Sequence, residues 1–389
     1  MTEHFDVVII GGGIHGVGVA QAAVCAGYSA LVLEKTALAS GSSSRSSKLI
    51  HGGLRYLEGP DFSLVRESLQ ERALLLKIAP DLVRLQPFHI PVYGDTSRRP
   101  LMIRSGLSLY ALLAGFGPSG RFRKLRRAEW SRLDGLATTG LQCVYRYYDA
   151  QTNDVRLTQA VMQSALELGA RLYCPAEFLA AEIAPDGCRI RYRRNGHLTS
   201  CRAGALVNAA GPWINHIADR IHPANGRIDI DLVQGTHLVL EGRLESGCYY
   251  LEVPADRRAV FLLPWGDHTL LGTTEHLYTG DPADVAPLDA EEAYLLEVMR
   301  HYFPQRPQRV LERYAGLRVL PGSGPAAFHR SRETSLQTDD PRRPRLVWVY
   351  GGKLTGYRAT GHKVMRLLRR TLPARKTVAR TSQLRLKPV

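Results

Sequence analysis

The most constraining stretch of this chain is its opening, where an apolar strand runs directly into a glycine-rich turn. Residues 5–10 read FDVVII, and residues 11–16 read GGGIHG. A short run of mostly β-branched residues is typical of a strand buried on both faces. Gly11, Gly13 and Gly16 match G-x-G-x-x-G. In that motif the first glycine permits a tight turn, the second lets a pyrophosphate approach the backbone, and the third lets a helix pack on the strand.

The residues after the motif complete a dinucleotide-binding pattern. We expect a helix over 14–26, whose N-terminus offers N–H groups and partial positive charge to phosphates. A second apolar strand, 30–33, ends on Glu34, near the spacing of about 20 residues at which a carboxylate meets the ribose hydroxyls. Because the elements occur in order, we predict a dinucleotide site rather than a ligand-free glycine turn. The acid at Glu34 disfavours NADP, and the motif alone leaves FAD and NAD open.

Bulk properties narrow the class of protein. The 389 residues predict about two or three domains, and a hydrophobic content of 44% suits a globular protein with a large core. The net charge of +15 fits a solvated basic surface, an anionic substrate or an anionic membrane face. Nucleic acid ranks last as a partner, because the sequence contains no nucleic-acid-binding motif.

Cysteine usage and the N-terminus indicate a cytoplasmic protein. The six cysteines are scattered without C-x-x-C spacing, which is typical of reduced thiols rather than of a disulfide framework or a metal site. The first strand begins within about five residues of the start, so no signal peptide is expected. No apolar run reaches the roughly 18 residues of a spanning helix.

A serine-rich stretch, 39–48, follows the acid-bearing strand and precedes the residues LIHGGLRY. The stretch is either a flexible linker or a loop whose hydroxyls and N–H groups line a pyrophosphate and ring. His51, Arg55 and Tyr56 concentrate catalytic side chains in one short segment. A surface loop with a chance cluster is the alternative.

The remaining patterns predict secondary structure along the rest of the chain. Helices are expected at 62–78, 154–168 and 291–303, and from about 360. Strands are expected at 87–92, 171–173, 188–192, 206–213, 236–240, 249–253, 259–264, 269–274, 314–320 and 346–350, with the strands 171–173 and 188–192 framing a turn at 185–187. Several of these strands, between 229 and 274, suggest an antiparallel sheet in a second domain.

Two further stretches carry functional expectations. Residues 101–116 are apolar and are followed by a basic run, 121–127, so they form either a core-packed helix or a helix lying on an anionic membrane. Arg318 lies within an apolar strand. A buried charge needs a partner or a ligand, so Arg318 is a candidate for binding an anion.

Taken together, these motifs resemble the FAD-dependent glycerol-3-phosphate dehydrogenases, within the D-amino-acid-oxidase-like flavoprotein superfamily. The string SKLIHGGLRY at 47–56 is the most specific match. The other matching stretches, which occur in family order and cover nearly the whole chain, are 9–18, 207–213, 235–237, 272–275, 316–318 and 351–358.

The resemblance implies FAD rather than NAD, and a mixed α/β and α+β fold. A Rossmann-like FAD-binding domain, assembled from 1–80, 142–220 and 310–389, would be intertwined with an antiparallel-sheet substrate domain formed by 81–141 and 221–309. The family's dehydrogenases usually carry a further C-terminal helical domain, and we expect this chain to lack it. The sequence also has Glu275 where the family often has Asp, and Gly356 where it often has Thr.

The resemblance also assigns site residues. Those expected to bind the cofactor are Gly11, Gly13, Ile14, His15, Gly16, Glu34, Lys35, Ser42, Ser43, Ser46, Ser47, Lys48, His51, Gly52, Gly53, Phe178, Ala209, Gly211, Trp213, Gly316, Arg318, Gly352, Lys353, Leu354 and Thr355. Those expected to act on substrate are His51, Arg55, Tyr56, His237, Thr274, Arg318, Arg330 and Lys353. The choice between His51 and His237 as the base stays open, as does the choice between Arg330 and Arg332.

The activity implied is oxidation of sn-glycerol 3-phosphate to dihydroxyacetone phosphate by hydride transfer to flavin N5. Electrons would pass to a membrane quinone, with peripheral contact on the inner face of the cytoplasmic membrane and a homodimer as one compatible assembly. Guanidinium groups suit a phosphate because they bind it bidentately. The alternative is a flavin oxidase or dehydrogenase of the same superfamily that acts on another small anionic hydroxy or amino acid.

Overall fold

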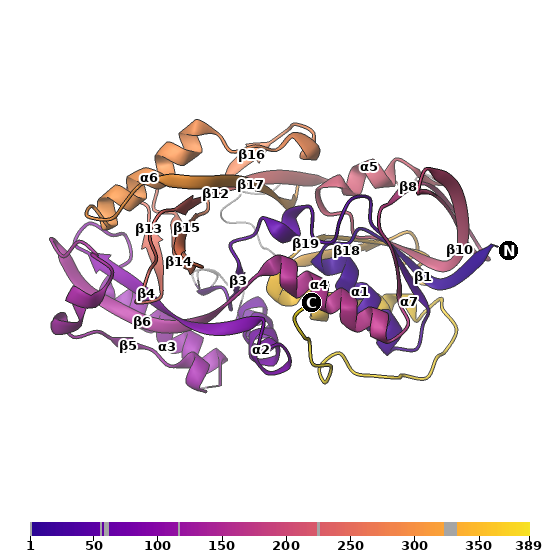
Figure 1. Ribbon diagram of the computed structural model, residues 1–389. Helices are drawn as coiled ribbons and strands as arrows, with labels where there is room; N and C mark the ends of the chain where they lie inside the picture. The colour runs from indigo at the N-terminus through magenta and orange to yellow at the C-terminus, as the bar shows by residue number, and fades with distance from the viewer. Residues whose placement is uncertain (1, 55–56, 58–61, 116, 224–225, 323–332) are drawn as a thin grey trace.

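The computed structural model describes residues 2–54, 57, 62–115, 117–223, 226–322 and 333–389. The sequence predictions for Arg55, Tyr56, Arg330 and Arg332 therefore fall outside the described residues. Two β-sheets lie side by side, each with helices packed on it (Figure 1).

The first sheet contains the strand that precedes the glycine motif. Its strands, in spatial order, are β11 (Ile221–His222), β8 (Ala176–Ala184), β9 (Gly187–Arg194), β10 (His197–Asn208), β1 (Glu3–Ile10), β2 (Ala30–Leu33) and β7 (Arg171–Tyr173), with β19 (Leu346–Gly351) on β10 and β18 (Thr334–Thr338) on β19. β1 is parallel to both β10 and β2. From Phe5 to Ile10 the strand is buried, because sheet neighbours flank it and helices cover it. This is the Rossmann-like half of the fold.

Three helices cover one face of the first sheet. They are α1 (Ile14–Cys25), α4 (Asp154–Glu167) and α7 (Tyr357–Leu368), and α1 packs against both of the others. Eleven of the twelve residues of α1 are buried, which explains its apolar, small-residue composition. The short helix α5 (Ile214–Ala218) follows β10. The packing holds the N-terminus of α1 at the carboxyl end of β1, where dinucleotides bind in sheets of this kind.

The second sheet is larger and mostly antiparallel. Its strands, in spatial order, are β16 (His276–Tyr278), β12 (Ile230–Leu240), β15 (His268–Gly272), β14 (Ala259–Trp265), β13 (Cys248–Glu252), β4 (Val83–Tyr93), β6 (Leu141–Thr152) and β3 (Leu49–Ile50), with β17 (Val310–Pro321) on β12 and β5 (Arg123–Lys124) on β6. Its helices are α2 (Phe62–Ile78), α3 (Pro100–Leu113) and α6 (Asp289–Tyr302). The long strands β12 and β17 run along the top of Figure 1 toward the first sheet.

Most of the predicted elements are confirmed, and two expectations need correction. The turn at 185–187 joins β8 to β9, because β7 is instead a parallel neighbour of β2. The strand expected at 206–213 ends at Asn208 and gives way to a 3-10 turn, η5 (Gly211–Trp213). The strands β6 and β17, most of which lie within the ranges 142–220 and 310–389 predicted for the cofactor domain, pair with strands of the second sheet, and the domain boundaries themselves stay a prediction.

Candidate active site

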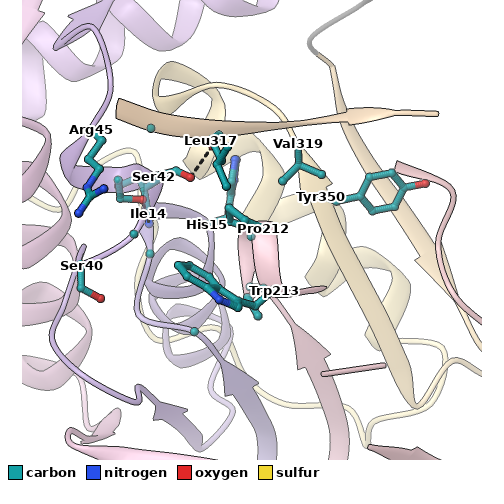
Figure 2. Close-up of a pocket in the computed structure, with 18 of the residues that line it drawn as sticks. Ile14, His15, Ser40, Ser42, Arg45, Pro212, Trp213, Leu317, Val319 and Tyr350 are labelled. Carbon is teal, nitrogen blue, oxygen red and sulfur yellow. Dashed lines mark hydrogen bonds between the residues drawn. The ribbon is translucent and has the colours of Figure 1, made fainter. Parts of the chain in front are cut away.

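A cavity of about 540 Å³ lies between the two sheets, within the size range of small-molecule and cofactor sites. Its wall includes the glycine motif and Glu34 from the first sheet, and Gly235 and the 316–320 stretch from the second. Figure 2 shows how Ile14, Trp213 and Leu317, which come from distant parts of the chain, border the same space.

The glycine motif has the backbone geometry that the sequence predicted. Gly11 has a φ of +105°, a value that suits glycine, and a Cβ at Gly16 would overlap the carbonyl oxygen of Gly11. The first glycine therefore makes the turn, and the third lets α1 lie close to β1. At the start of α1, the N–H of Ile14 donates to Ser43 Oγ at 2.9 Å, so the serine loop meets the helix N-terminus.

Glu34 is tied to the motif by hydrogen bonds. Its carboxylate accepts from the N–H of Gly12 at 2.7 Å and from the N–H of Thr36 at 2.8 Å. Glu34 also lines the cavity. Because these are charge-assisted bonds to a largely buried carboxylate, Glu34 orders the turn in addition to the ribose contact that the sequence predicts for it.

The serine-rich stretch is an anchored loop rather than a flexible linker. Ser42 Oγ donates to the carbonyl of Leu317 at 2.6 Å (Figure 2), and Ser46 Oγ donates to Asp154 at 2.7 Å. Lys48 Nζ lies 2.8 Å from Asp154, with both side chains almost completely buried. The structure therefore directs Lys48 toward α4 and leaves it off the cavity wall.

His15 is a buried imidazole on the cavity wall. Burial lowers its pKa to about 4, partly offset by a hydrogen bond to the backbone of Gly351, so the ring is neutral near pH 7. Within the described part of the chain its Nδ1 has no hydrogen-bond partner. A buried nitrogen without a partner is costly, and a bound ligand carrying donors would remove that cost.

These features fit FAD. The wall contains a glycine turn and a helix N-terminus that can bind phosphates, and the Glu34 carboxylate that can bind ribose hydroxyls. It also contains His15 Nδ1, which has no hydrogen-bond partner within the described residues. The residues that would hold FAD in this cavity are therefore those of the motif, Glu34, the serine loop and the 351–354 turn.

His51, directly after β3, and Lys353, in the β19–α7 connection, both line the cavity. The N–H of His51 donates to Thr355 Oγ1 at 3.2 Å, and the His51 ring lies 6.4 Å from that of Phe261. Lys353 Nζ is 3.4 Å from Ser68 Oγ. Thr355 thus holds the backbone of His51 from behind the wall.

Arg318 on β17 lines the cavity and has protein partners. Its Nη1 is 2.6 Å from the Glu275 carboxylate, and its Nη2 donates to the carbonyl of Thr274 at 2.7 Å. Glu275 is therefore the partner for the charge of Arg318, since its carboxylate balances the guanidinium within the chain. What supports an anion-binding role for Arg318 is its position on the wall.

His237 on β12 also lines the cavity, but in a strongly perturbed environment. Its Nε2 is 2.9 Å from Ser47 Oγ, and its ring stacks on Tyr314 with centroids 5.1 Å apart. Burial, with the nearby charges of Lys48 and Arg318, lowers its pKa to about 3. His237 is therefore neutral at physiological pH and a weak proton acceptor.

The structure brings most of the predicted site residues to one cavity. Those on its wall are Gly11, Gly13, Ile14, His15, Glu34, Lys35, Ser42, Ser43, Ser46, Ser47, His51, Phe178, Ala209, Gly211, Trp213, His237, Gly316, Arg318, Gly352, Lys353 and Leu354. Those placed off the wall are Gly16, Lys48, Gly52, Gly53, Thr274 and Thr355.

Several wall residues were missed by the sequence reasoning. They are Thr36, Ser40, Arg45, Glu177, Pro212, Thr273, Val319 and Tyr350, among others. Thr36, Ser40 and Arg45 lie in or beside the serine loop, so treating the whole loop as lining would have found them. Val319 and Tyr350 had no such signal, because a strand residue reaches the cavity only through the placement of β17 and β19.

Comparison with known proteins places this site among flavoenzymes. The family model described as FAD dependent oxidoreductase (DAO) matches residues 6–364. A glycerol-3-phosphate dehydrogenase of Pseudomonas tolaasii is 37% identical over 372 residues, covering 94% of this chain and 71% of that protein. A D-erythritol 1-phosphate dehydrogenase of Brucella abortus is 34% identical, covering 95% of this chain and 75% of that protein.

A solved structure agrees in fold. The glycerol-3-phosphate dehydrogenase from Bacillus halodurans, complexed with FAD, matches with a TM-score of 0.74 at 23% identity, covering 98% of this chain and 68% of that one.

Proposed function

Since the chain belongs to the DAO family of FAD-dependent oxidoreductases, we propose that it oxidises sn-glycerol 3-phosphate to dihydroxyacetone phosphate. The observation that carries the proposal is the single cavity wall that joins the nucleotide motif to His51, Arg318 and Lys353. Relatives named glycerol-3-phosphate dehydrogenase, at 37% and 38% identity, support the choice of substrate.

Oxidation of a secondary alcohol removes a hydride from carbon and a proton from the hydroxyl oxygen. Bound FAD supplies the hydride acceptor at N5. We assign the proton to His51, because its imidazole lines the cavity and a positioned histidine can accept a proton from a reacting group. His237, with a pKa of about 3, is a poor acceptor, and its hydrogen bond suits it to holding Ser47 in place.

The phosphate end is assigned to Arg318, whose guanidinium can bind phosphate bidentately. Glu275 fixes the orientation of that guanidinium through its 2.6 Å contact. Lys353 adds positive charge to the cavity wall and would stabilise negative charge developing on the flavin ring. The roles of Arg55, Tyr56, Thr274 and Arg330 stay predictions.

A second candidate substrate is D-erythritol 1-phosphate. The observation that favours it is the 34% identity to a D-erythritol 1-phosphate dehydrogenase, of which this chain covers 75%. Both candidates are phosphorylated polyols, so both need a fixed cation and a base. Comparing kcat/KM for the two substrates decides between them.

The assignment of Arg318 is tested by replacing Arg318 with Ala and measuring activity on glycerol 3-phosphate and on glycerol. Loss of a charge-assisted contact worth about 1.5–3 kcal/mol predicts a fall in kcat/KM of about 10- to 150-fold on the phosphorylated substrate, with a much smaller change on glycerol. Arg313→Ala is the matched control, since Arg313 lies on the same strand and pairs with Asp289 and Glu292 at the surface. Equal losses on both substrates would contradict the phosphate assignment.

We further propose that electrons pass to a membrane quinone while the protein lies on the membrane surface. In the described ranges, no helix has the length and apolar character needed to span a bilayer. The helix α3 packs one face inward through Ile103, Leu107 and Tyr110, while Leu101 and Met102 are 73% and 51% exposed. The structure is therefore compatible with both alternatives for residues 101–116, a core-packed helix and a helix on a membrane surface. One face of α3 packs against the core, and the exposed face can contact lipid.

Cosedimentation with vesicles of anionic lipid tests the membrane proposal. Leu101→Glu/Met102→Glu should lose binding, while Leu198→Glu, a change at a 74% exposed leucine on β10, should keep it. Equal sedimentation of the wild type and the two variants would contradict the membrane proposal. Peroxide release in air would identify oxygen as the acceptor in place of quinone.

A further inference from the structure

Behind the wall that carries His51, three side chains from separate elements form a buried polar network. Arg72 on α2 lies 2.5 Å from Asp149 on β6, and Tyr110 on α3 donates to the other oxygen of that carboxylate at 2.8 Å. The side chains of Arg72 and Asp149 are 1% and 3% exposed. None of the three lines the cavity, so the network has no place in the chemistry described above.

Most polar atoms of the network are hydrogen-bonded, which is the condition under which a buried ion pair is tolerated, and among the described residues only Arg72 Nε of the guanidinium lacks a partner. Arg72 also donates to the carbonyls of Tyr148 at 2.9 Å and Ser119 at 3.0 Å. Burial lowers the pKa of Arg72, but the attraction of Asp149 outweighs it and the net shift is upward, so the guanidinium stays charged. Burial and the same carboxylate raise the pKa of Tyr110 well above 10, so its hydroxyl keeps its proton.

The network ends on the backbone next to His51. The N–H of Gly52 donates to the Tyr110 hydroxyl at 2.9 Å and, more weakly, to Asp149 at 3.3 Å. A Cβ at Gly52 would overlap the Tyr110 hydroxyl and the side chain of Leu69, so the amide sits as close to the network as a backbone can. With Thr355 bonded to the N–H of His51, the histidine is held on both sides.

We propose that Tyr110 is a positioning residue for His51: its hydroxyl, oriented by the Asp149–Arg72 pair, fixes the Gly52 amide and through it the imidazole. This inference rests on the proposed role of His51 as proton acceptor. A reacting group displaced by about 1 Å can lose about 100-fold in rate. Loss of the Tyr110 hydroxyl should therefore lower kcat by about 10- to 100-fold, with KM and FAD binding little changed.

The test uses Tyr110→Phe in the FAD-loaded protein. Tyr302→Phe is the matched control, because Tyr302 is equally buried and its hydroxyl donates to the carbonyl of Glu252 at 2.6 Å within the second sheet's core. The two variants should have similar FAD contents and similar melting temperatures. Only Tyr110→Phe should show a lower kcat. A wild-type kcat in Tyr110→Phe, or an equal loss in Tyr302→Phe, would overturn the inference.

A double-mutant cycle separates positioning from general loosening of the fold. If Tyr110 acts through His51, then His51→Gln/Tyr110→Phe should be no slower than His51→Gln alone. Rate losses that multiply in the double variant would show that Tyr110 acts independently of His51 and would overturn the inference. If His51→Gln retains the wild-type kcat, the proposed role of His51 as proton acceptor is wrong. Because that result comes from the His51 substitution alone, it is distinguishable from a failure of the Tyr110 inference.

Discussion

Replacing Glu34 with Gln should weaken FAD binding strongly, because the Glu34 carboxylate orders the turn that faces the pyrophosphate. The carboxylate accepts from the N–H groups of Gly12 and Thr36 at 2.7 and 2.8 Å and is largely buried. Glutamine keeps one acceptor oxygen and turns its NH2 group toward the second N–H, so one buried donor is left without a partner.

The size of the effect follows from these contacts. A buried donor left unsatisfied costs about 1–3 kcal/mol, and the lost charge weakens the remaining bond. We expect about 2–3 kcal/mol, which corresponds to an increase in Kd of about 30- to 150-fold. Titration of apoprotein with FAD, followed by flavin fluorescence, measures this Kd directly.

The control for Glu34 is Glu182→Gln, which removes the same charge from an exposed position on β8. This variant should bind FAD as the wild type does. A Kd for Glu34→Gln within about threefold of the wild type, in a protein with unchanged circular dichroism, would refute the reasoning that the carboxylate orders the turn.

Two further predictions concern stability. Asp154→Asn leaves the buried Lys48 ammonium without its counter-charge and should lower the free energy of unfolding by about 3–5 kcal/mol. The double variant Lys48→Met/Asp154→Leu removes both charges and should recover much of that loss in urea denaturation. Equal destabilisation by the two variants would contradict a role for the ion pair. Burial lowers the pKa of His15 and His89 to about 4 and of His237 to about 3, against 6.5 when unfolded, so below pH 6.5 the unfolded chain binds protons that the folded chain cannot. Each histidine should lower the free energy of unfolding by about 1.4 kcal/mol per pH unit as the pH falls from 6.5 toward 4. His89→Phe removes one of the three groups and should make the pH dependence of stability shallower by about 1.4 kcal/mol per pH unit. The same pH dependence in the variant and the wild type, measured by urea denaturation between pH 7 and about 4.5, would contradict the lowered pKa of His89.

The parts of the fold that the sequence predicts are those with a strong local signal. The strand, glycine turn and helix at 5–25 are specified by β-branched residues, by glycines at fixed spacing and by small apolar residues. β8 was missed because its sequence, AEFLAAEIA, is rich in residues that favour helices, and only pairing with β9 makes it a strand. β6 was missed because Val144 and Asp149 interrupt the alternation of apolar and polar residues in its sequence, LQCVYRYYDAQT.

The same distinction applies to the site. His51 and Lys353 were found because they lie in short motifs, whereas the contact between Tyr110 and Gly52 joins residues 58 positions apart and leaves no trace in either local pattern. Likewise, the sequence showed that Arg318 needed a partner, but only the pairing of β12 with β16 and β17 brings Glu275 beside it. Local spacing thus identified the cofactor motif, while the supporting contacts required the tertiary structure.

The central claim is that one cavity holds FAD beside a base and a fixed cation, so that a phosphorylated polyol is oxidised there. The most direct test is anaerobic addition of glycerol 3-phosphate to the purified FAD-loaded protein, followed by the visible flavin absorbance. We predict that the absorbance bleaches fully at about one equivalent of glycerol 3-phosphate, and that glycerol at the same concentration bleaches it far more slowly. A flavin that stays oxidised in the presence of excess glycerol 3-phosphate and D-erythritol 1-phosphate would contradict the account.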